Sequence, residues 1–383
     1  MKVIEKIRSK IFQHYMLIVS VALLGNCVSP ADIPLSEVPP LLVVEGFITD
    51  DFGPHEIRVT RLARFAGIRD GGSIEQVDAS VSITDDLGNS VQLLRQNLQR
   101  KEIFNDPPEA CVPNVTFAQV ITDYRTPDSF KGEVGRSYTL EIETDGRVYR
   151  SEPQTIVPTP IIDELSLSFL EIPTLNDAQP RSGVEIFAKW QDPEEPSFYS
   201  WRVNGIYRVS TRNVLGGVAC CLYDPADNGA EDCWIIEPDI EGNVIAVNDR
   251  FFNGQQTTQK VGFIEDDGLR FANTEVPESK QYYIEVEQYR ISEEAYNFYD
   301  RVTTISSIDG EIFDPPPLSI SGNITNIEDP SETVIGFFGA FSVQRSDIFV
   351  DRKMLSFTQI FLRPCGDCRV RGGAQVEVPD PYK

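Results

Sequence analysis

Histidine is scarce in this sequence, which has two in 383 residues, His14 and His55. His14 falls within the first 26 residues, which we expect to be a cleaved leader. A Ser-His-Asp or Cys-His catalytic arrangement would therefore have to use His55, whose surroundings Gly53-Pro54-His55-Glu56 are typical of a solvated hairpin turn. The low count also excludes a zinc site built on several histidines. No motif in the sequence names a reaction.

Long hydrophobic runs are also missing. A membrane-spanning helix needs about 20 apolar residues, and no segment after residue 27 resembles one. The apolar stretch Met16–Leu24 has nine residues and follows a leader with four basic side chains. This order and length are typical of the hydrophobic region of a secretory signal. We therefore predict that residues 1–26 are a signal peptide.

Cys27 is the most informative residue of the N-terminal region. It closes the sequence Leu24-Gly25-Asn26-Cys27 directly after the apolar stretch. A thiol at this point is what a bacterial lipoprotein signal peptidase requires, so we predict that Cys27 becomes the lipidated first residue of the mature protein. Asn26 stands where Gly, Ala or Ser is usual. The alternative is an ordinary signal peptide in which Cys27 is incidental.

Positive charge is in short supply, because 34 Lys and Arg face 59 Asp and Glu, for a formal net charge of −25. The predicted leader holds four basic side chains and one acidic side chain, so without it 30 basic and 58 acidic side chains remain, a net charge near −28. Such a charge repels phosphate backbones, so we expect no nucleic-acid partner. It also disfavours electrostatic docking on anionic lipid, which makes a covalent lipid anchor the better attachment to a bilayer.

The chain has seven cysteines. With Cys27 lipidated, the even remainder of six is typical of up to three disulfides in an exported protein, with fifteen possible pairings. We expect bridges that fasten a cysteine-containing insertion to the C-terminal tail. A zinc site with four thiolates and a redox-active Cys-X-X-Cys pair are the alternatives. The disulfide candidates are Cys111, Cys220, Cys221, Cys233, Cys365 and Cys368.

The N-terminal half is predicted to be a tether followed by a β-sandwich. Residues 27–40 contain four prolines and almost no apolar periodicity, which is typical of an extended tether. Across residues 41–157, short segments alternate apolar and polar side chains, most clearly in the predicted hairpin Ser137–Ser151 with its turn at Asp145-Gly146. Apolar side chains at every second position give each strand one apolar face, which indicates a half-buried antiparallel sheet. We expect an immunoglobulin-type or transthyretin-type sandwich.

The C-terminal half is predicted to be a larger β-rich domain at residues 160–383. It follows the proline-containing junction Val157-Pro158-Thr159-Pro160, which cannot continue a strand ladder. Alternating segments indicate further strands, and residues 216–242 form an irregular insertion with three cysteines. One helix is expected at about residues 292–308, because Ser292 can cap exposed amides and acidic residues follow it. The fold class is therefore mainly β with one helix.

The tryptophans and the acidic loop offer candidate contacts. Trp190 and Trp201 fall on the inward register of their strands and are expected in the core. Trp234, in the insertion, is a possible ligand contact that could offer a flat face to a sugar, and covering a disulfide is the alternative. We predict no metal and no cofactor. The alternative is a calcium site in the insertion, formed by Asp224, Asp227 and Glu231. Their spacing does not match the EF-hand pattern.

Several short motifs occur in an order that resembles a known family. They are the lipoprotein cysteine, Leu42-Val43-Val44-Glu45-Gly46-Phe47-Ile48-Thr49, the hairpin of the first domain, Pro160-Ile161-Ile162-Asp163, Cys220-Cys221, the tyrosine-rich helix, Ile312-Phe313-Asp314-Pro315-Pro316, Ser321-Gly322-Asn323-Ile324 and the terminal Cys-X-X-Cys. Together they resemble a Bacteroidota envelope lipoprotein family defined as a domain of unknown function, DUF4249. The resemblance covers nearly the whole mature chain, and its specificity lies in the order of the motifs.

This resemblance implies a location and a setting, with no established activity. It implies an outer-membrane lipoprotein, often encoded beside TonB-dependent receptors, with the membrane face left open. We therefore expect a non-enzymatic binding or accessory subunit of a TonB-dependent transport system. The alternatives are an adhesive or structural envelope lipoprotein and a hydrolase that acts on glycans with paired carboxylates, since two such groups could stand among 58 acidic residues.

Overall fold

The fold is known from a computed structural model of the chain. The predicted signal peptide (1–26), Cys27 and the tether up to residue 39 lie outside the residues that it describes. The structure describes residues 40–62, 74–103, 116–172, 181–210, 214–215, 218–219, 232–238, 245–266, 270–271, 276–306, 322–355, 368 and 373–383.

The described residues are mainly β, which confirms the predicted fold class. Strands up to the predicted junction are β1 (Leu41–Thr49), β2 (Glu56–Leu62), β3 (Ile74–Gln76), β4 (Ser80–Asp85), β5 (Ser90–Gln92), β6 (Leu94–Ile103), β7 (Thr116–Arg125), β8 (Ser137–Thr144), β9 (Arg147–Ser151) and β10 (Gln154–Thr155). Later strands are β11 (Glu164–Ile172), β12 (Arg181–Gln191), β13 (Phe198–Ser210), β14 (Val214–Leu215), β15 (Val218–Ala219), β16 (Asp232–Glu237), β17 (Ile245–Asn248), β18 (Gln256–Glu265), β19 (Tyr282–Ile291), β20 (Ile324–Asn326), β21 (Val334–Val350) and β22 (Ala374–Gln375).

Helical structure is sparse in the described ranges. The α-helix α2 (Glu293–Ser306) is within two residues of the predicted helix. Three short 3₁₀ turns accompany it: Glu278–Lys280, Arg352–Met354 and Asp380–Tyr382. Within the described part of the chain, no helix has both the length and the apolar composition needed to cross a bilayer.

The first core is closed by strands from both ends of the chain. Sheet β20-β9-β8-β4-β5 provides one layer, and β1 and β2 of the largest sheet face it. Buried side chains alternate along β1, where Leu42, Val44 and Ile48 are inside, and along β8, where Tyr138, Leu140 and Ile142 are inside. The predicted hairpin is confirmed: Asp145 and Gly146 turn the chain with φ values of 50° and 73°.

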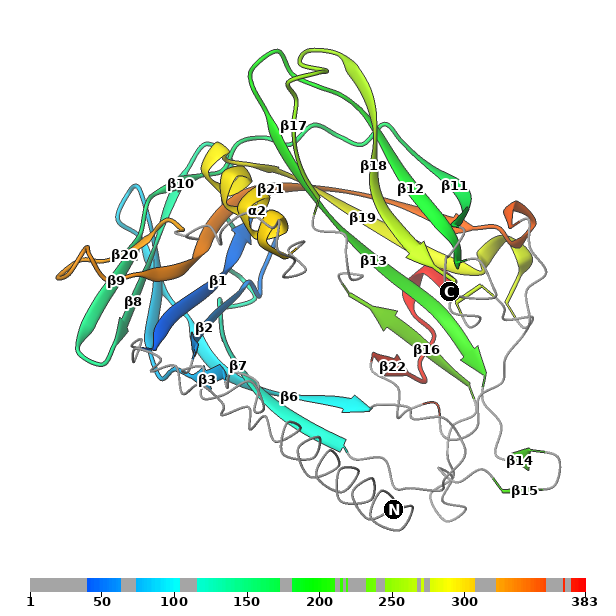
Figure 1. Ribbon diagram of the computed structural model, residues 1–383, viewed down its shortest axis with the longest axis horizontal. Helices are drawn as coiled ribbons and strands as arrows, with labels where there is room; N and C mark the ends of the chain where they lie inside the picture. The colour runs from blue at the N-terminus through cyan, green and yellow to red at the C-terminus, as the bar shows by residue number, and fades with distance from the viewer. Residues whose placement is uncertain are drawn as a thin grey trace, which may run out of the picture. The chain divides into compact units, whose positions relative to one another are not determined.

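β21 joins this core to the rest of the molecule, and its path is visible as the long orange strand in Figure 1. It pairs in parallel with β1 through Leu42–Thr49 and antiparallel with β19 through its second half. Phe338 and Ala340 enter the first core, and Val350 enters the second. The predicted division at the proline junction therefore separates most residues of the two cores, while one strand serves both.

Gly336 explains how β21 lies so close to β1. Its φ of +122° is in a region that side chains avoid, and a Cβ there would stand 1.8 Å from the carbonyl oxygen of Val44. Glycine therefore permits the parallel pairing at this point. Residues 40–383 form one compact unit.

The second core lies between the three-stranded sheet β11-β12-β18 and the part of the largest sheet made by β16, β13, β19 and β21. It is rich in aromatic side chains. Trp190 is fully buried and contacts Tyr199 and Phe252 edge-on, with ring centroids 5.1 Å and 5.9 Å apart. Trp201 is 2% exposed, so both tryptophans that were predicted to be core residues are buried.

Candidate functional site

The largest sheet presents a second face, opposite to the two cores, on which α2 packs. Along β13, Tyr199, Trp201 and Val203 point into the second core, so Ser200 and Arg202 lie on the opposite side. Helix α2 contacts β13, β17 and β21, beside which it appears in Figure 1. We call this side the α2 face.

A pocket opens on the α2 face, with a volume of about 120 Å³. Side chains from five elements that are distant in sequence line it. They include Phe47 of β1, Ser200 and Arg202 of β13, Tyr289 of β19, Tyr299 of α2 and Phe341 of β21. The pairing of β1, β21, β19 and β13 in consecutive order brings these positions together. The lining is aromatic on several sides and has one guanidinium.

Helix α2 is fixed in place by its cap and its aromatic side chains. The hydroxyl of Ser292 accepts a hydrogen bond from the Ala295 amide at 3.2 Å and donates one to Gln154 at 3.0 Å. The ring of Tyr296 packs on Phe198 with centroids 5.1 Å apart. These contacts confirm the predicted role of Ser292 and hold the helix against the sheet, where it forms one wall of the pocket.

Arg202 and Tyr299 give the pocket its polar character. The guanidinium of Arg202 lies 5.3 Å from the centre of the Phe47 ring, which is a cation–π distance. Burial raises the pKa of Tyr299 to about 12, against a smaller opposing effect of Arg202. The phenol is therefore neutral at physiological pH and remains a hydrogen-bond donor.

A buried ionic network borders the pocket. Glu287 is 7% exposed, and its carboxylate accepts hydrogen bonds from the Tyr289 hydroxyl at 2.6 Å and from Arg345 at 2.8 Å. Arg345 also forms an ion pair with Asp51, in the loop after β1. Burial raises the pKa of Tyr289 well above its usual value. The network links β19 and β21 with the loop after β1 beside the pocket and satisfies the buried charge of Glu287.

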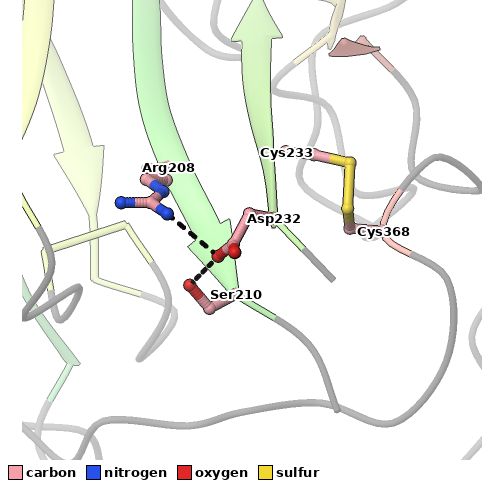
Figure 2. The surroundings of a disulfide bond; sticks show 5 residues. All are labelled: Arg208, Ser210, Asp232, Cys233 and Cys368. Carbon is pink, nitrogen blue, oxygen red and sulfur yellow. Dashed lines mark hydrogen bonds and ion pairs between the residues drawn. A yellow bond between two sulfur atoms is a disulfide. The ribbon is translucent and has the colours of Figure 1, made fainter. Parts of the chain in front are cut away.

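Two of the predicted disulfide candidates are joined to each other. Cys233 of β16 is bonded to Cys368, and the bridge closes a loop of 135 residues. Both half-cystines are buried. Figure 2 shows the bridge beside Asp232, which accepts a hydrogen bond from Ser210 at 2.6 Å and pairs with Arg208 at 3.2 Å. This pairing confirms the expected link between the insertion and the C-terminal tail.

Trp234, the predicted ligand contact, follows this bridge directly in sequence. It is 8% exposed, and its ring lies 4.2 Å from that of Tyr382, centroid to centroid. Tyr382 in turn donates a hydrogen bond to the carbonyl of Ile206 at 3.0 Å. The C-terminal segment thus covers the indole, and a ligand would have to displace Tyr382 to stack on it. In this structure the indole packs against Tyr382, and both the contact with a sugar and the covering of the disulfide stay predictions.

The other predicted site residues lie outside the described residues. They are Cys27, Cys111, Cys220, Cys221 and Cys365, together with the calcium alternatives Asp224, Asp227 and Glu231. Among the residues that the structure does describe, no three His, Cys, Asp or Glu side chains come together in a way that could hold a metal ion.

The prediction that His55 is solvated is wrong. The residue is 8% exposed, and its ring packs edge-on against Phe130 at 5.8 Å. Its amide donates to the Thr126 hydroxyl at 2.8 Å, and its Nε2 has no partner among the described residues. Burial lowers its pKa from the usual 6.5. The β7–β8 connection folds over this turn and removes it from water, which the local sequence does not reveal.

Two buried carboxylates in the second core bear on the hydrolase alternative. Asp192 accepts hydrogen bonds from the Tyr199 hydroxyl at 2.6 Å and from the Gly254 amide at 3.0 Å. Asp249 accepts one from the Ser197 amide at 2.6 Å, and burial raises the pKa of its carboxyl. These contacts show that both groups fasten loops at the end of the core.

The comparisons with known proteins identify the family. The family model described as "Domain of unknown function (DUF4249)" matches residues 28–347, so the chain belongs to this family. The match begins directly after Cys27 and covers every described residue that lines the pocket. Searches of the curated proteins and of the solved structures gave no significant match.

Proposed function

We propose that the protein is an outer-membrane lipoprotein, anchored through Cys27, that serves as a non-enzymatic binding or accessory subunit of a TonB-dependent transport system. The observation that carries the proposal is the order of a basic leader, nine apolar residues and Cys27 at the N-terminus. Membership of the DUF4249 family supports it, because the family domain starts at the residue after the anchoring cysteine.

The charge of the chain supports covalent attachment. With a formal net charge of −25, the protein is repelled by anionic headgroups and needs another means of staying at the bilayer. A lipidated N-terminal cysteine provides it, since several acyl chains hold a protein at a membrane far more firmly than one. The proline-containing residues 27–40 would then act as a spacer between the lipid and the β-rich unit.

The described fold supports a binding role. Extensive sheets with an aromatic pocket on one face give a rigid surface, and rigid elements position contact residues more accurately than loops. On the α2 face β13, β19, β21 and β1 pair in this order, and the network around Glu287 links β19 with β21 and with the loop after β1. A partner that contacts this face would meet a preformed site.

The experiment is solubilisation of the outer membrane in mild detergent, followed by affinity purification of the tagged chain. We expect a TonB-dependent transporter to co-purify with the protein, and we expect Cys27→Ser to abolish membrane association. Asn26→Ala is the matched control, because it changes the neighbouring residue and keeps the thiol. Purification of the tagged chain without a transporter would contradict the accessory role. A Cys27→Ser chain that still fractionates with the envelope would contradict the lipid anchor.

An adhesive envelope protein and a glycan hydrolase are the other two functions that the sequence leaves open, and the same preparation separates them. Binding to a matrix polymer in place of a transporter would indicate adhesion. Turnover of a glycan panel would indicate catalysis by carboxylates.

A further inference from the structure

We propose that three adjoining turns at one end of the first core form a docking surface for a protein whose contact surface is apolar at its centre and basic around it. The turns are residues 50–55 between β1 and β2, residues 85–89 from the end of β4 to β5, and residues 126–136 between β7 and β8. We call them the end turns. Within the proposed function this protein is the TonB-dependent transporter, so the inference rests on that function and names the surface that the transporter contacts.

Each end turn holds a large apolar side chain in solvent. Phe52 is 70% exposed, Leu87 is 73% exposed and Val134 is 48% exposed. Single exposed apolar side chains are common on protein surfaces, whereas a group of them on neighbouring loops marks an interaction surface. Loops on a rigid scaffold are also where binding residues concentrate. The three side chains are therefore candidate contacts for a partner.

The end turns are bonded to one another. The Gly53 amide donates a hydrogen bond to the Phe130 carbonyl at 2.8 Å, and the Asp86 amide donates one to the Ser137 carbonyl at 3.0 Å. Arg136 also forms an ion pair with Asp86 at 2.5 Å. The turn between β7 and β8 thus contacts both of the others, and the three apolar side chains belong to one surface.

Further hydrogen bonds fix the conformation of the end turns. The Asp85 carboxylate accepts from the Leu87 amide at 3.0 Å and from the Asn89 amide at 2.8 Å. The amide of Glu133, next to Val134, donates to a side-chain hydroxyl at 2.9 Å. Loops that are already ordered lose little conformational entropy on association, which favours binding. The exposed apolar groups are therefore presented by a preorganised frame.

The charge of the end turns determines the kind of partner. Together they hold six acidic and two basic side chains, a net charge of −4. Such a surface repels anionic lipid headgroups, and it repels a second copy of itself because like charges would face each other. A protein surface with basic side chains around an apolar centre complements it in both respects.

The end turns lie far from the point at which the chain enters the β-rich unit. That point is Leu41, the first residue of β1, whereas Phe52 follows the last residue of the same strand, Thr49, by three positions. A strand of nine residues spans about 30 Å. Binding at the end turns therefore leaves the entry point at Leu41 uncovered.

The experiment is co-purification of the tagged full chain from the outer membrane, with the amount of transporter measured per chain. The variant that combines Phe52→Ser, Leu87→Ser and Val134→Ser should recover at least tenfold less transporter than the parent. Its urea unfolding should match that of the parent, because the three side chains are exposed. The matched control is Phe251→Ser, which removes an 88% exposed aromatic ring from the connection between β17 and β18 and should recover as much as the parent.

The outcomes separate this inference from the proposed function. Recovery of the transporter by the triple variant at the level of the parent would overturn the inference and leave the proposed function standing. An equal loss in Phe251→Ser would also overturn it, because the effect would not belong to the end turns. A parent chain that purifies without a transporter would overturn both.

A second pair of variants tests the charge of the partner. Asp128→Lys with Glu133→Lys reverses two exposed acidic groups of the end turns and should lower the recovery of transporter at least threefold. The control is Glu143→Lys with Glu152→Lys, which reverses two exposed acidic groups outside them and should recover as much as the parent. Unchanged recovery with the first pair would contradict a basic partner surface.

Two other occupants are tested with the Cys27→Ser chain, which lacks the proposed anchor. We expect it not to bind vesicles of phosphatidylethanolamine and phosphatidylglycerol, and we expect its mass in light scattering to be the same with and without the triple substitution. Vesicle binding that the triple substitution abolishes would assign the end turns to a bilayer. A dimer that the same substitution dissociates would assign them to a second copy of the chain. Either result would overturn the proposal.

Discussion

The two cores of this protein differ in the side chains that fill them. The first is largely aliphatic, and its strands alternate regularly between inward apolar and outward polar side chains. The second contains Trp190, Trp201 and Tyr282 and also buries polar groups. Tyr282, for example, donates a hydrogen bond to Glu237 at 2.6 Å, and the same carboxylate is held by Arg270. The first core has satisfied polar contacts as well, since the Tyr124 hydroxyl donates a hydrogen bond to the Val77 carbonyl at 2.8 Å. The cores therefore differ mainly in their content of large aromatic side chains.

The cores also differ in how they are closed. The first is closed by β20 and β21, which come from late in the chain, whereas the second has a disulfide between Cys233 and Cys368. All three tryptophans of the sequence belong to the second part of the chain. Tryptophan fluorescence therefore reports on the second core, and hydrogen exchange of the β8 amides reports on the first. This difference allows each core to be tested separately.

The largest expected effect comes from the strand that both cores share. Gly336→Ala should lower the free energy of unfolding by about 3 kcal/mol or more, because the new Cβ meets the Val44 carbonyl and the backbone is in a region that alanine avoids. Urea unfolding by fluorescence and exchange of the β8 amides should both shift. Gly88→Ala is the control: its φ is +85°, nothing lies within 4 Å of the new atom, and the cost should be about 1–2 kcal/mol. If only one of the two probes responds to Gly336→Ala, β21 does not couple the cores.

Loss of the disulfide should affect the second core more than the first. Replacing both half-cystines in the variant Cys233→Ala with Cys368→Ala should lower the stability reported by tryptophan by about 2–4 kcal/mol, because the bridge constrains the unfolded chain. Protection of the β8 amides should fall by less, because the bridge lies in the second core and reaches the first through β21. Ser210→Ala, which removes a hydrogen bond to Asp232 beside the bridge, is a control expected to cost about 1 kcal/mol. An equal loss of protection in β8 would contradict the separation of the two cores.

The helix that covers the α2 face should respond to its cap. Ser292→Ala should cost about 1 kcal/mol, because the Ala295 amide loses its acceptor and Gln154 loses a partner. Faster exchange of the amides in the first turn of α2 is the measurement. Ser292→Thr keeps the hydroxyl and should behave as the parent, and a Thr variant as unstable as Ala would show that the cap is not the cause.

The smallest effect is a pH dependence confined to the first core. Burial lowers the pKa of His55 in the folded state below 6.5, its usual value and the one expected when the chain is unfolded. The neutral form is therefore favoured by folding, so its contribution is present above about pH 6.5 and is lost as the pH falls below that value. Protection of the β8 amides should decline between pH 7 and pH 5, and His55→Gln should flatten this decline. An unchanged slope in that variant would assign the effect to other groups.

Elements with local signals were predictable from the sequence. The alternation of Tyr138, Leu140 and Ile142 with a following Asp-Gly turn predicted the hairpin, and Ser292 with two acidic residues after it predicted α2. The even number of cysteines after Cys27, in a chain expected to be exported, predicted disulfides, and the Cys233–Cys368 bridge is one of them. Each of these signals lies within a few residues or depends on composition alone.

Features that depend on distant pairing were not predictable. The parallel contact between β1 and β21 joins opposite ends of the family domain, and no residue pattern specifies such a register. The pocket was missed for the same reason, because Phe47, Arg202 and Tyr299 meet only when their strands and α2 are assembled. His55 was predicted to be exposed because Phe130, which covers it, comes from another turn.

Mass determination of the mature N-terminal peptide tests the central claim of a lipid-anchored protein most directly. We predict a chain that begins at Cys27 and carries the added mass of a diacylglycerol group with a further acyl chain. A peptide with an unmodified thiol at Cys27, or one that begins at a different residue, would contradict the account.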